Sequence, residues 1–527
     1  MIDTVALREK VLDLAIRGKL VPQDPNDEPA SVLLERIRAQ KQQMVKDGKL
    51  KAKDIKDDSI IFVGEDNLHY EKFADGTVKC LVDEVPFSLP NGWEWSRVKT
   101  FCALNPKNIL PDDEHASFIP MPLIKEGYAN EHSYEERTWG LIKNGFTHFA
   151  NDDIGIAKIT PCFENRKSVV FRNLTHGVGS GTTELFIVRS ISDQVLSDYL
   201  LWNFKTQRFI DGGVQTYTGD VGQQRVRRDY LANYLIAIPP INEQIRILKS
   251  IDYSFKLIDT IDESQCEMSE LIVKARSKIL DLAIRGKLVP QNPDDEPASA
   301  LLERIRAEKE VLIKQGKIKR DKKESVIFKG EDNSYYEKFD GGEIKCIDED
   351  VPFELPDSWR WCRLGTLFAH NTGKALNSSD TAGTPMTYIT TSNLYWDRFE
   401  LDSLKEMPFT ESEIEKCTVT KGDLLVCEGG DIGRSAIWMF DEDIRIQNHI
   451  HRLRPYISLS NRFYYYVLFM WKQIGRIGGQ GIGLQGFSSK ALHNLIVPLP
   501  PISEQLQIVA FVDELNQKLS DIEKSLS

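Results

Sequence analysis

The twelve residues LDLAIRGKLVPQ occur twice in this chain, at Leu12–Gln23 and at Leu280–Gln291, without a single difference. The match continues downstream, where PASVLLERIRA (Pro29–Ala39) returns as PASALLERIRA (Pro297–Ala307), 268 residues later. Two such matches in the same order indicate that a long segment has been duplicated.

The duplication reaches further along both copies. VPFSLPNGWEW (Val85–Trp95) returns as VPFELPDSWRW (Val351–Trp361), and LIAIPPINEQ (Leu235–Gln244) returns as LIVPLPPISEQ (Leu495–Gln505). Between these matches the two copies share little sequence. A unit of roughly 260 residues is much longer than a solenoid repeat, so we interpret it as a duplicated pair of domains.

The residues from 241 to 286 have the pattern of one long helix. Apolar or small residues recur every three or four positions, close to the 3.5-residue period of a coiled coil. These residues are Leu248, Ile251, Phe255, Ile258, Ile261, Met268, Ile272, Ala275 and Ile279. Polar Gln265 interrupts the seam, and Gly286 followed by Pro290 ends the helix. An ordinary amphipathic helix on a globular core is the alternative interpretation.

The second copy of this long helix is divided between the two ends of the chain. Residues 502–527 match its first part, and residues 1–18 match its second part. We therefore expect a circular arrangement in which the termini lie close together. The divided helix and the intact one should run antiparallel, related by a pseudo-twofold axis.

A second helix follows in each copy. Pro29 and Pro297 occupy positions typical of a first helical turn, and Gly48 and Gly316 end the helical pattern. Residues 36–56 hold eight basic residues against two acids, and residues 304–323 hold nine against three. These strips are either solvated helix faces or a pair of surfaces that contact nucleic-acid backbone.

Composition places the chain among soluble globular proteins. Its 527 residues are 41% hydrophobic and 28% charged, enough for three or four domains. The N-terminal residues lack the pattern of a signal peptide, and no apolar run is long enough to span a bilayer. The eight cysteines are scattered without CxxC spacing, which predicts reduced thiols and a cytoplasmic location. The net charge of −12 means that DNA binding would depend on local basic patches or on partners.

The segments between the repeated blocks, residues 93–240 and 359–501, are named the first and second variable blocks. Short β-like runs alternate with turns rich in Gly, Asn and Asp, which predicts a compact α/β domain in each. GIGLQG (Gly481–Gly486) matches GxGxxG without the strand and helix of a dinucleotide site. DGGEIK (Asp340–Lys345) has the ExK of a metal nuclease, but its copy ADGTVK has Thr77 instead of Glu343, so a surface hairpin is favoured.

No motif of catalysis or cofactor binding appears. The sequence has no GxxxxGK[ST] phosphate loop, no HExxH and no (N/D)PP(Y/F) tetrad of an adenine methyltransferase. The predictions are therefore that the chain is not an enzyme and has no cofactor or metal of its own.

The variable blocks do contain residue types that read DNA. Asn and Gln bond adenine, Arg bonds guanine, and Lys, Arg, Ser and Thr contact phosphate. The motifs are AKITPCFENRK, GSGTTE and GDVGQQRVRR in the first block, and EGGDIGRSAI, RIQNHIHRLRP and GGQGIGLQGFSSK in the second. The predicted DNA-binding residues are Lys158, Thr160, Asn165, Lys167, Ser180, Thr182, Thr183, Gln215, Gln223, Gln224, Arg225, Arg227, Arg228, Arg434, Ser435, Gln447, Asn448, His449, Arg452, Gln480 and Gln485. The alternative is that these clusters are turns and hairpins of a solvated domain.

The order and duplication of these motifs resemble the specificity (S) subunit of Type I DNA restriction–modification systems, over essentially the whole chain. The resemblance implies an α+β fold with two α/β target recognition domains joined by long antiparallel coiled-coil helices. It also implies that each recognition domain reads one half of a split sequence in double-stranded DNA. The helices would set the gap between the halves and dock two methyltransferase (M) subunits, which carry S-adenosylmethionine, while restriction (R) subunits complete the complex.

The resemblance and the repeat together divide the chain into five parts. Residues 1–92 form an N-terminal conserved region with the end of the divided helix, a basic helix and a hairpin. Residues 93–240 form target recognition domain 1, 241–358 a central conserved region, 359–501 target recognition domain 2, and 502–527 a C-terminal helix. A stand-alone DNA-binding regulator or anti-restriction decoy with the same two domains is the main alternative, and a protein scaffold without DNA is a third.

The variable blocks depart from the family pattern in different ways. NDDIGIAKIT has Asn151–Asp153 where the family has a Gly-Asp turn, and we expect the turn to persist. The second block lacks TPCFEN and has CEGGDIGRSA instead. The two domains should therefore read different half-sites and give an asymmetric target.

Overall fold

The computed structural model describes residues 2–48, 55–56, 58–220, 222–321, 324–376, 382–477 and 487–526. The chain divides into two compact units, the first unit (Ile2–Gln265) and the second unit (Cys266–Ser527). Each unit contains one copy of the sequence repeat. The predicted long helix is confirmed as α8 (Ile241–Ile284), which gives its first half to the first unit and its second half to the second.

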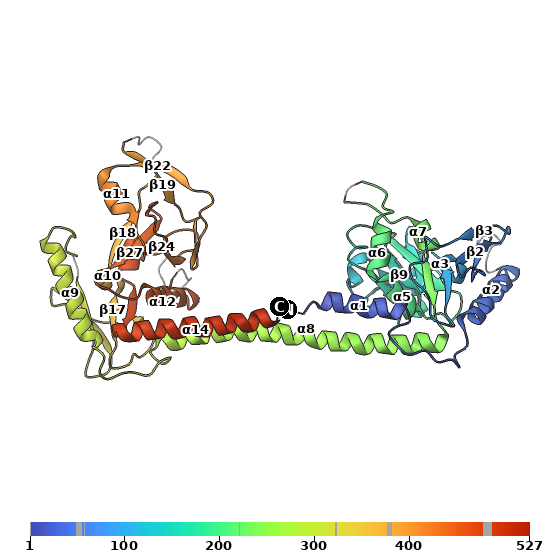
Figure 1. Ribbon diagram of the computed structural model, residues 1–527, viewed down its shortest axis with the longest axis horizontal. Helices are drawn as coiled ribbons and strands as arrows, with labels where there is room; N and C mark the ends of the chain where they lie inside the picture. Colours follow the sequence, from blue (N-terminus) through green and yellow to red (C-terminus); the bar gives the residue numbers. More distant parts are fainter. Residues whose placement is uncertain are drawn as a thin grey trace. The chain divides into compact units, whose positions relative to one another are not determined.

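In the first unit, α1 (Thr4–Ile16) runs antiparallel to the first half of α8. The Thr4 hydroxyl donates to Asp262 at 2.6 Å, and Arg8 donates to Asp259 at 2.6 Å, so rising numbers on α1 meet falling numbers on α8. Figure 1 shows α1 lying along this part of α8. The predicted antiparallel pairing is confirmed within this unit.

The second unit repeats the arrangement with α14 (Ile502–Leu526) beside the second half of α8 (Figure 1). Arg276 donates to Ser520 at 3.0 Å and to Glu523 at 3.1 Å, near the end of α14. Ile508 and Val512 share a core with Leu280 and Ile284. The nearness of the chain termini and the pseudo-twofold axis stay predictions, because they concern both units.

The buried seam of α8 follows the predicted heptads with one change. Ile251, Phe255, Ile258 and Ile272 are buried, and Gln265 is buried among them, with its side-chain nitrogen 3.4 Å from the Ile2 carbonyl. Met268, predicted on the seam, is 39% exposed and was placed wrongly. Seven residues separate Ile258 from Gln265 and Gln265 from Ile272, so the polar residue, not the methionine, keeps the heptad.

Each unit contains the predicted second helix and hairpin. The helices are α2 (Ala30–Lys46) and α9 (Ala298–Lys314). Pro29 and Pro297 are their N-caps, one position before the predicted first turn. The three-stranded sheets are β1 (Ser59–Val63), β2 (His69–Phe73) and β3 (Val78–Cys80), and β14 (Ser325–Lys329), β15 (Tyr335–Phe339) and β16 (Ile344–Cys346). The ADGTVK and DGGEIK segments are hairpin turns in these sheets, as predicted.

The first variable block contains two four-stranded sheets, in the orders β10-β9-β12-β5 and β7-β6-β11-β8. Their pairs are antiparallel except β6 with β11. The strands are β5 (Cys102–Leu104), β6 (His115–Ile119), β7 (Glu135–Thr138), β8 (Thr147–Ala150), β9 (Ile154–Ala157), β10 (Ser168–Val170), β11 (Val178–Gly181) and β12 (Leu185–Ser190). Strands β4 (Glu94–Arg97) and β13 (Leu235–Ile238) pair at the two ends of the block.

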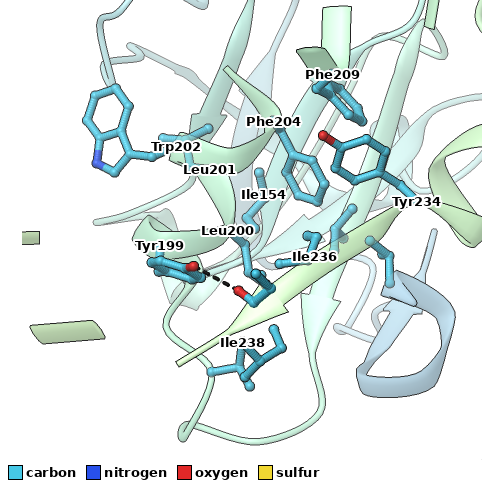
Figure 2. Packing of buried hydrophobic residues seen from close by; sticks show 14 of the residues in the cluster. Ile154, Tyr199, Leu200, Leu201, Trp202, Phe204, Phe209, Tyr234, Ile236 and Ile238 are labelled. Carbon is cyan, nitrogen blue, oxygen red and sulfur yellow. Dashed lines mark hydrogen bonds between the residues drawn. The ribbon is translucent and has the colours of Figure 1, made fainter. Parts of the chain in front are cut away.

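The helices of this block are short. They are α3 (Val98–Phe101), α4 (Trp139–Ile142), α5 (Ser197–Phe204), α6 (Gln207–Val214) and α7 (Arg228–Asn233), with 3-10 turns η2 (Met121–Leu123) and η3 (Thr175–Gly177). Figure 2 shows how α5 packs its Tyr199, Leu200 and Phe204 side chains against β13. The Tyr199 hydroxyl donates to the Ala237 carbonyl at 2.8 Å, so a buried polar group is satisfied inside this apolar core.

The second variable block repeats both sheet orders, as β25-β24-β27-β18 and β22-β19-β26-β23, with the parallel pair at β19 and β26. The strands are β17 (Arg360–Arg363), β18 (Phe368–Thr372), β19 (Thr384–Ile389), β20 (Leu394–Tyr395), β21 (Arg398–Phe399), β22 (Lys405–Phe409), β23 (Thr418–Val419), β24 (Leu424–Cys427), β25 (Ser435–Ile437), β26 (Ile444–Ile446), β27 (Ile450–Pro455) and β28 (Ile496–Leu499). The helices are η4 (Asp348–Asp350), just before the block, α10 (Leu364–Leu367), α11 (Glu411–Cys417), α12 (Asn461–Gln473) and α13 (Ser489–His493). The two blocks therefore have one fold despite their different sequences.

The repeated block LDLAIRGKLVPQ forms the corner where a long helix ends. Gly18 adopts φ +63°, and a Cβ there would lie 2.4 Å from Pro90 Cγ. Gly286 adopts φ +65°, and a Cβ there would lie 2.5 Å from Pro356 Cγ. Only glycine fits both the left-handed backbone and this close approach.

A buried glutamate closes each corner. Glu243 accepts from Trp93 Nε1 at 3.0 Å and from Gln23 at 3.3 Å. Glu504 accepts from Trp359 Nε1 at 2.8 Å and from Gln291. Burial raises the pKa of both carboxyls, and the bonds from Trp and Gln oppose that rise. The repeated motifs, far apart in sequence, thus meet in one hydrogen-bonded joint per unit.

No helix within the described ranges is long and apolar enough to cross a membrane.

Candidate nucleic-acid interface

Three predicted motifs of the first variable block meet at one surface patch. The Thr160 amide donates to the Gln224 carbonyl at 3.0 Å, and the Val226 amide donates to the Lys158 carbonyl at 2.8 Å. The Lys158 amide in turn donates to the Glu184 carbonyl at 3.0 Å. Residues of AKITPCFENRK, GSGTTE and GDVGQQRVRR are therefore held side by side by main-chain hydrogen bonds.

Arg225 lies at the centre of this patch. Its Nε donates to Glu184 Oε2 at 2.9 Å and its Nη2 donates to Glu184 Oε1 at 2.8 Å. Its Nη1 donates to the Gln223 carbonyl at 3.0 Å. The hydrogen bond from Arg225 is the main cause that lowers the pKa of Glu184, so the carboxylate stays charged at neutral pH.

Lys158 adds a second positive charge to the patch. Its Nζ lies 5.5 Å from the centre of the Phe186 ring. Burial lowers the pKa of Lys158, while the charge of Glu184 opposes that change. Two cations around one carboxylate leave the patch with a net positive charge.

Other predicted residues surround Arg225 on the exterior. Thr183, Gln215, Gln223, Arg227 and Arg228 are exposed, and Thr182 is half-buried. Their side chains are accessible to a ligand at the same surface loop or next to it.

Two predicted residues of the AKITPCFENRK motif have partners elsewhere. Asn165 donates to Glu126 at 3.3 Å, and Lys167 Nζ lies 3.5 Å from the Met121 carbonyl. Between them, Arg166 forms an ion pair with Glu9 of α1 at 2.8 Å. This part of the motif attaches the variable block to the helix, a structural role that the sequence analysis missed.

In the second variable block, the segment Gln447–His449 lies beside Lys374 and Glu428. The Asn448 amide donates to the Lys374 carbonyl at 2.9 Å, and the Glu428 amide donates to the His449 carbonyl at 2.9 Å. His449 Nδ1 lies 3.8 Å from Glu428 Oε2. Lys374 Nζ contacts Glu413 at 2.9 Å. Arg434 is linked to this group through Cys427, the residue before Glu428, whose amide donates to the Arg434 carbonyl at 2.8 Å. The guanidinium of Arg434 lies over the Tyr395 ring.

Three predicted side chains are buried and are not accessible to DNA in this structure. Ser180 has no exposed surface, and its hydroxyl donates to the Ile142 carbonyl at 2.8 Å. Ser435 is equally buried. Arg452 is 5% exposed and donates to the Thr418 carbonyl. These residues lie on strands β11, β25 and β27. Gln480 and Gln485 lie outside the described residues.

The two blocks share an ion pair with a buried carboxylate, at the opposite ends of these strands from Lys158, Glu184, Glu428 and His449. Asp153 accepts from Arg189 Nε at 2.7 Å and is 1% exposed. Asp423 accepts from Arg454 Nε at 2.7 Å and is 3% exposed. Each aspartate also accepts a backbone amide, from Ala150 or Thr420. The expected turn before Asp153 persists, with Asp152 at φ +65° where the second block has Gly422 at φ +94°.

The patch contains residues that the sequence analysis had not selected. Glu184 of the first block and Glu428 of the second are acids, whereas the predicted DNA-binding residues were chosen as hydrogen-bond donors or cations. Lys374 lies in no motif and comes next to Gln447 through a parallel bridge between distant segments. No local pattern in the sequence pairs Glu184 with Arg225, because 41 residues separate them. Among the described residues, no three His, Cys, Asp or Glu side chains gather as a metal site.

Comparisons with known proteins agree with this architecture. A family model for the Type I restriction modification DNA specificity domain matches residues 356–527. The chain is 36% identical to the Type I restriction enzyme EcoAI specificity subunit of Escherichia coli, over 97% of this chain and 88% of that protein. It is 34% identical to the EcoEI specificity subunit of the same species, over 96% of this chain and 88% of that protein.

Two solved structures share the fold. The crystal structure of the HsdS subunit from Thermoanaerobacter tengcongensis aligns with a TM-score of 0.50 and 16% identity, covering 85% of this chain and 94% of that one. A chain from a study of complex assembly and conformational transition of the type I R-M system aligns with a TM-score of 0.52 and 18% identity, covering 84% of this chain and 94% of that one. With two relatives above 30% identity along nearly the whole sequence, this chain belongs to the family of Type I restriction enzyme specificity subunits.

Proposed function

We propose that this specificity subunit recognises an asymmetric, two-part DNA sequence, with one variable block reading each half. The observation that carries the proposal is that both blocks have one frame and different surface chemistry. Lys158, Glu184 and Arg225 lie on the first. On the second block, Glu428 stands at the position equivalent to Lys158, and His449 at the position equivalent to Glu184. Different donors and charges on one frame predict different half-sites.

The proposed boundaries follow the pairing of the block ends. We assign residues 93–240 and 359–501 to the two target recognition domains, with 1–92, 241–358 and 502–527 as the conserved regions. Strand β4 pairs with β13, and β17 pairs with β28, so each domain begins and ends in one small sheet. When two weakly binding domains are joined in one chain, binding of the first makes binding of the second effectively intramolecular, which raises specificity for the full site.

The chain would act without catalysis of its own and would depend on partners. Two M subunits would supply the methyl transfer to adenine, with R subunits joining for cleavage. A duplicated surface supports two equivalent M sites. In the first unit Ile60, Phe62 and Val78 are 44%, 39% and 54% exposed on one face of the β1-β2-β3 sheet.

The second unit has the same face at Val326, Phe328 and Ile344, which are 39%, 37% and 56% exposed. An exposed Lys lies between the outer apolar residues in both, at Lys72 and Lys338. Exposed apolar faces of this kind mark protein interaction sites. The partner surface would be apolar with an acidic side chain, and the occupant we assign is the M subunit.

Co-expression with the M subunit tests the recognition proposal. Genome-wide mapping of methylated adenine should give one two-part motif with unlike halves. Replacing residues 93–240 with the block of another family member should change one half only. A palindromic motif, or a change in both halves, would contradict independent reading.

Native mass spectrometry tests the docking proposal. Phe62→Ser should lower the number of bound M subunits from two to one, and the F62S/F328S double variant should remove both. Ile109→Ser, at a residue 96% exposed, is the control and should keep two. If the double variant still bound two M subunits, this face would not be the docking site.

A further inference from the structure

The orientation of Arg225 carries an inference about which base the first variable block reads, and it rests on the proposed function. An arginine guanidinium has five N–H donors. Nε and Nη2 each use one on Glu184, at 2.9 and 2.8 Å, and Nη1 uses one on the Gln223 carbonyl. Two donors remain, one on each terminal nitrogen.

The backbone of Arg225 is fixed as firmly as its side chain. The Arg225 amide donates to the Thr218 carbonyl at 2.9 Å, and the Thr218 amide donates back to the Arg225 carbonyl at 3.0 Å. On the other side, Arg225 forms a β-bridge with Ile159. A side chain held at both ends loses little freedom when it binds, so its donors act as a fixed fork.

The pair is accessible from solvent. The Arg225 side chain is 40% exposed, and that of Glu184 is 25% exposed. In the major groove, guanine presents two acceptors, O6 and N7, to such a fork, while adenine presents one acceptor beside a donor. Cytosine presents a donor, and thymine a single acceptor beside a methyl group.

A phosphate also accepts two hydrogen bonds from arginine, but this arginine is poorly suited to that role. Glu184 neutralises the charge of Arg225, so the pair adds little to the attraction for the DNA backbone, while its donors keep their direction. Arg228, which is exposed three residues later, is better suited to phosphate. We infer that Arg225 reads a guanine in the first half-site and that Glu184 is the residue that positions it.

The test uses the complex of the full chain with its M subunit and the mapped DNA site. Each guanine of the first half-site is replaced in turn by 7-deazaguanine, which lacks the N7 acceptor. Fluorescence anisotropy should show about a 10-fold loss of affinity at one position only. This measurement needs no variant protein, so it stands even if a substitution disturbs folding.

Variants then link that position to the two residues. R225A should weaken binding to the unmodified site by about 10- to 100-fold and show no further loss with 7-deazaguanine at the same position. E184A should relax discrimination at that position, and Glu184→Asp should restore part of it. E135A, which breaks the exposed Glu135–Arg137 pair of the same block, is the matched control and should change neither.

The outcomes separate the two proposals. A two-part site whose first half contains no guanine, or R225A losses that are equal on all sequences, would overturn the guanine assignment alone. Loss of stability in E184A with unchanged base discrimination would make Glu184 a structural residue and overturn its positioning role. Absence of any two-part site for the wild-type complex would overturn the proposed function, and this inference with it.

Discussion

In the first variable block Lys158 follows strand β9 and Glu184 precedes strand β12, whereas in the second Glu428 follows β24 and His449 precedes β27. The strands around these residues have the same order and the same parallel pair in both blocks. The same frame therefore presents a cation at one site and an anion at the other. Stability and recognition are assigned to different residues, and each can be changed separately.

The largest effects should come from the shared ion pair at the opposite end of these strands. Asp153→Ala and Asp423→Ala should each destabilise their own block by about 3 kcal/mol, because a buried arginine contact and a backbone amide lose their acceptor. Hydrogen exchange of β9 and β12, and of β24 and β27, measures the loss. Asp112→Ala, which removes the exposed partner of Lys143, is the control, with an effect below about 0.5 kcal/mol. Unequal costs for the two aspartates would show that the frames are not equivalent.

The next largest effect should come from acid, which should destabilise the second block more than the first. His370 Nε2 and His451 Nδ1 lie 2.9 Å apart in the second block, where the first has Leu104 and Phe186. Burial, with the charge of His451 and His493 adding to it, lowers the pKa of His370 to about 3. The unfolded chain therefore binds this proton first, near pH 6.5, so the stability is complete above that pH and falls as the pH decreases.

We expect the second block to lose about 2 kcal/mol between pH 7 and pH 5, and the first block less, although burial also lowers the pKa of its His132 and His148. Denaturant unfolding followed by hydrogen exchange of β18 and β27 measures this. The H370L/H451F double variant, which copies the first block, should remove the difference. An unchanged acid response in that variant would assign it to other groups.

Charge exchange at the equivalent surface positions should have a smaller effect. Lys158→Glu should weaken DNA binding by roughly 10-fold, and Glu428→Lys should strengthen it severalfold, mainly at low salt. Anisotropy at two salt concentrations separates this electrostatic part. Lys125→Glu, at an exposed lysine paired with Glu131, is the control in the first block. Equal responses at Lys158 and Lys125 would place Lys158 outside the interface.

The smallest effects are expected on the shared basic helices. Arg36 is paired with Glu28, and Arg304 donates to Glu296 at 2.7 Å. Arg36→Ala and Arg304→Ala should change stability by less than about 0.5 kcal/mol and DNA affinity by less than about twofold. A clear decrease in the salt dependence of binding for either variant would support the alternative, in which these helices contact the DNA backbone.

Periodic and repeated features were the ones that sequence analysis predicted. The long helix, the second helices, the hairpins and the corners follow from heptads, end signals and duplicated motifs, all of which are local. Met268 was misplaced because it is apolar and lies three residues after Gln265, whereas the heptad runs from Gln265, which was placed on the seam correctly, to Ile272. Pro29 and Pro297 lie one position before the predicted first helical turn, which is a typical uncertainty of helix ends.

The candidate site was predicted less completely, because it depends on contacts between distant segments. Glu184 and Arg225 are 41 residues apart, and no local pattern pairs them. Arg452 lies on β27 with its side chain against β23 of the other sheet, where it donates to the Thr418 carbonyl, so it is buried although its motif is rich in polar residues. Residue type alone does not separate a side chain on the surface from one inside the sheet.

The glutamine that follows each corner glutamate shows how such a protein acquires new specificities. Gln244 accepts from the Leu196 amide at 2.9 Å, and Gln505 accepts from the Ser460 amide at 3.1 Å. Both contacts are made by main-chain amides, which every amino acid except proline offers. These two contacts would therefore survive most substitutions in the variable block, whereas the Arg166–Glu9 contact of the first block depends on a side chain and would be lost with it.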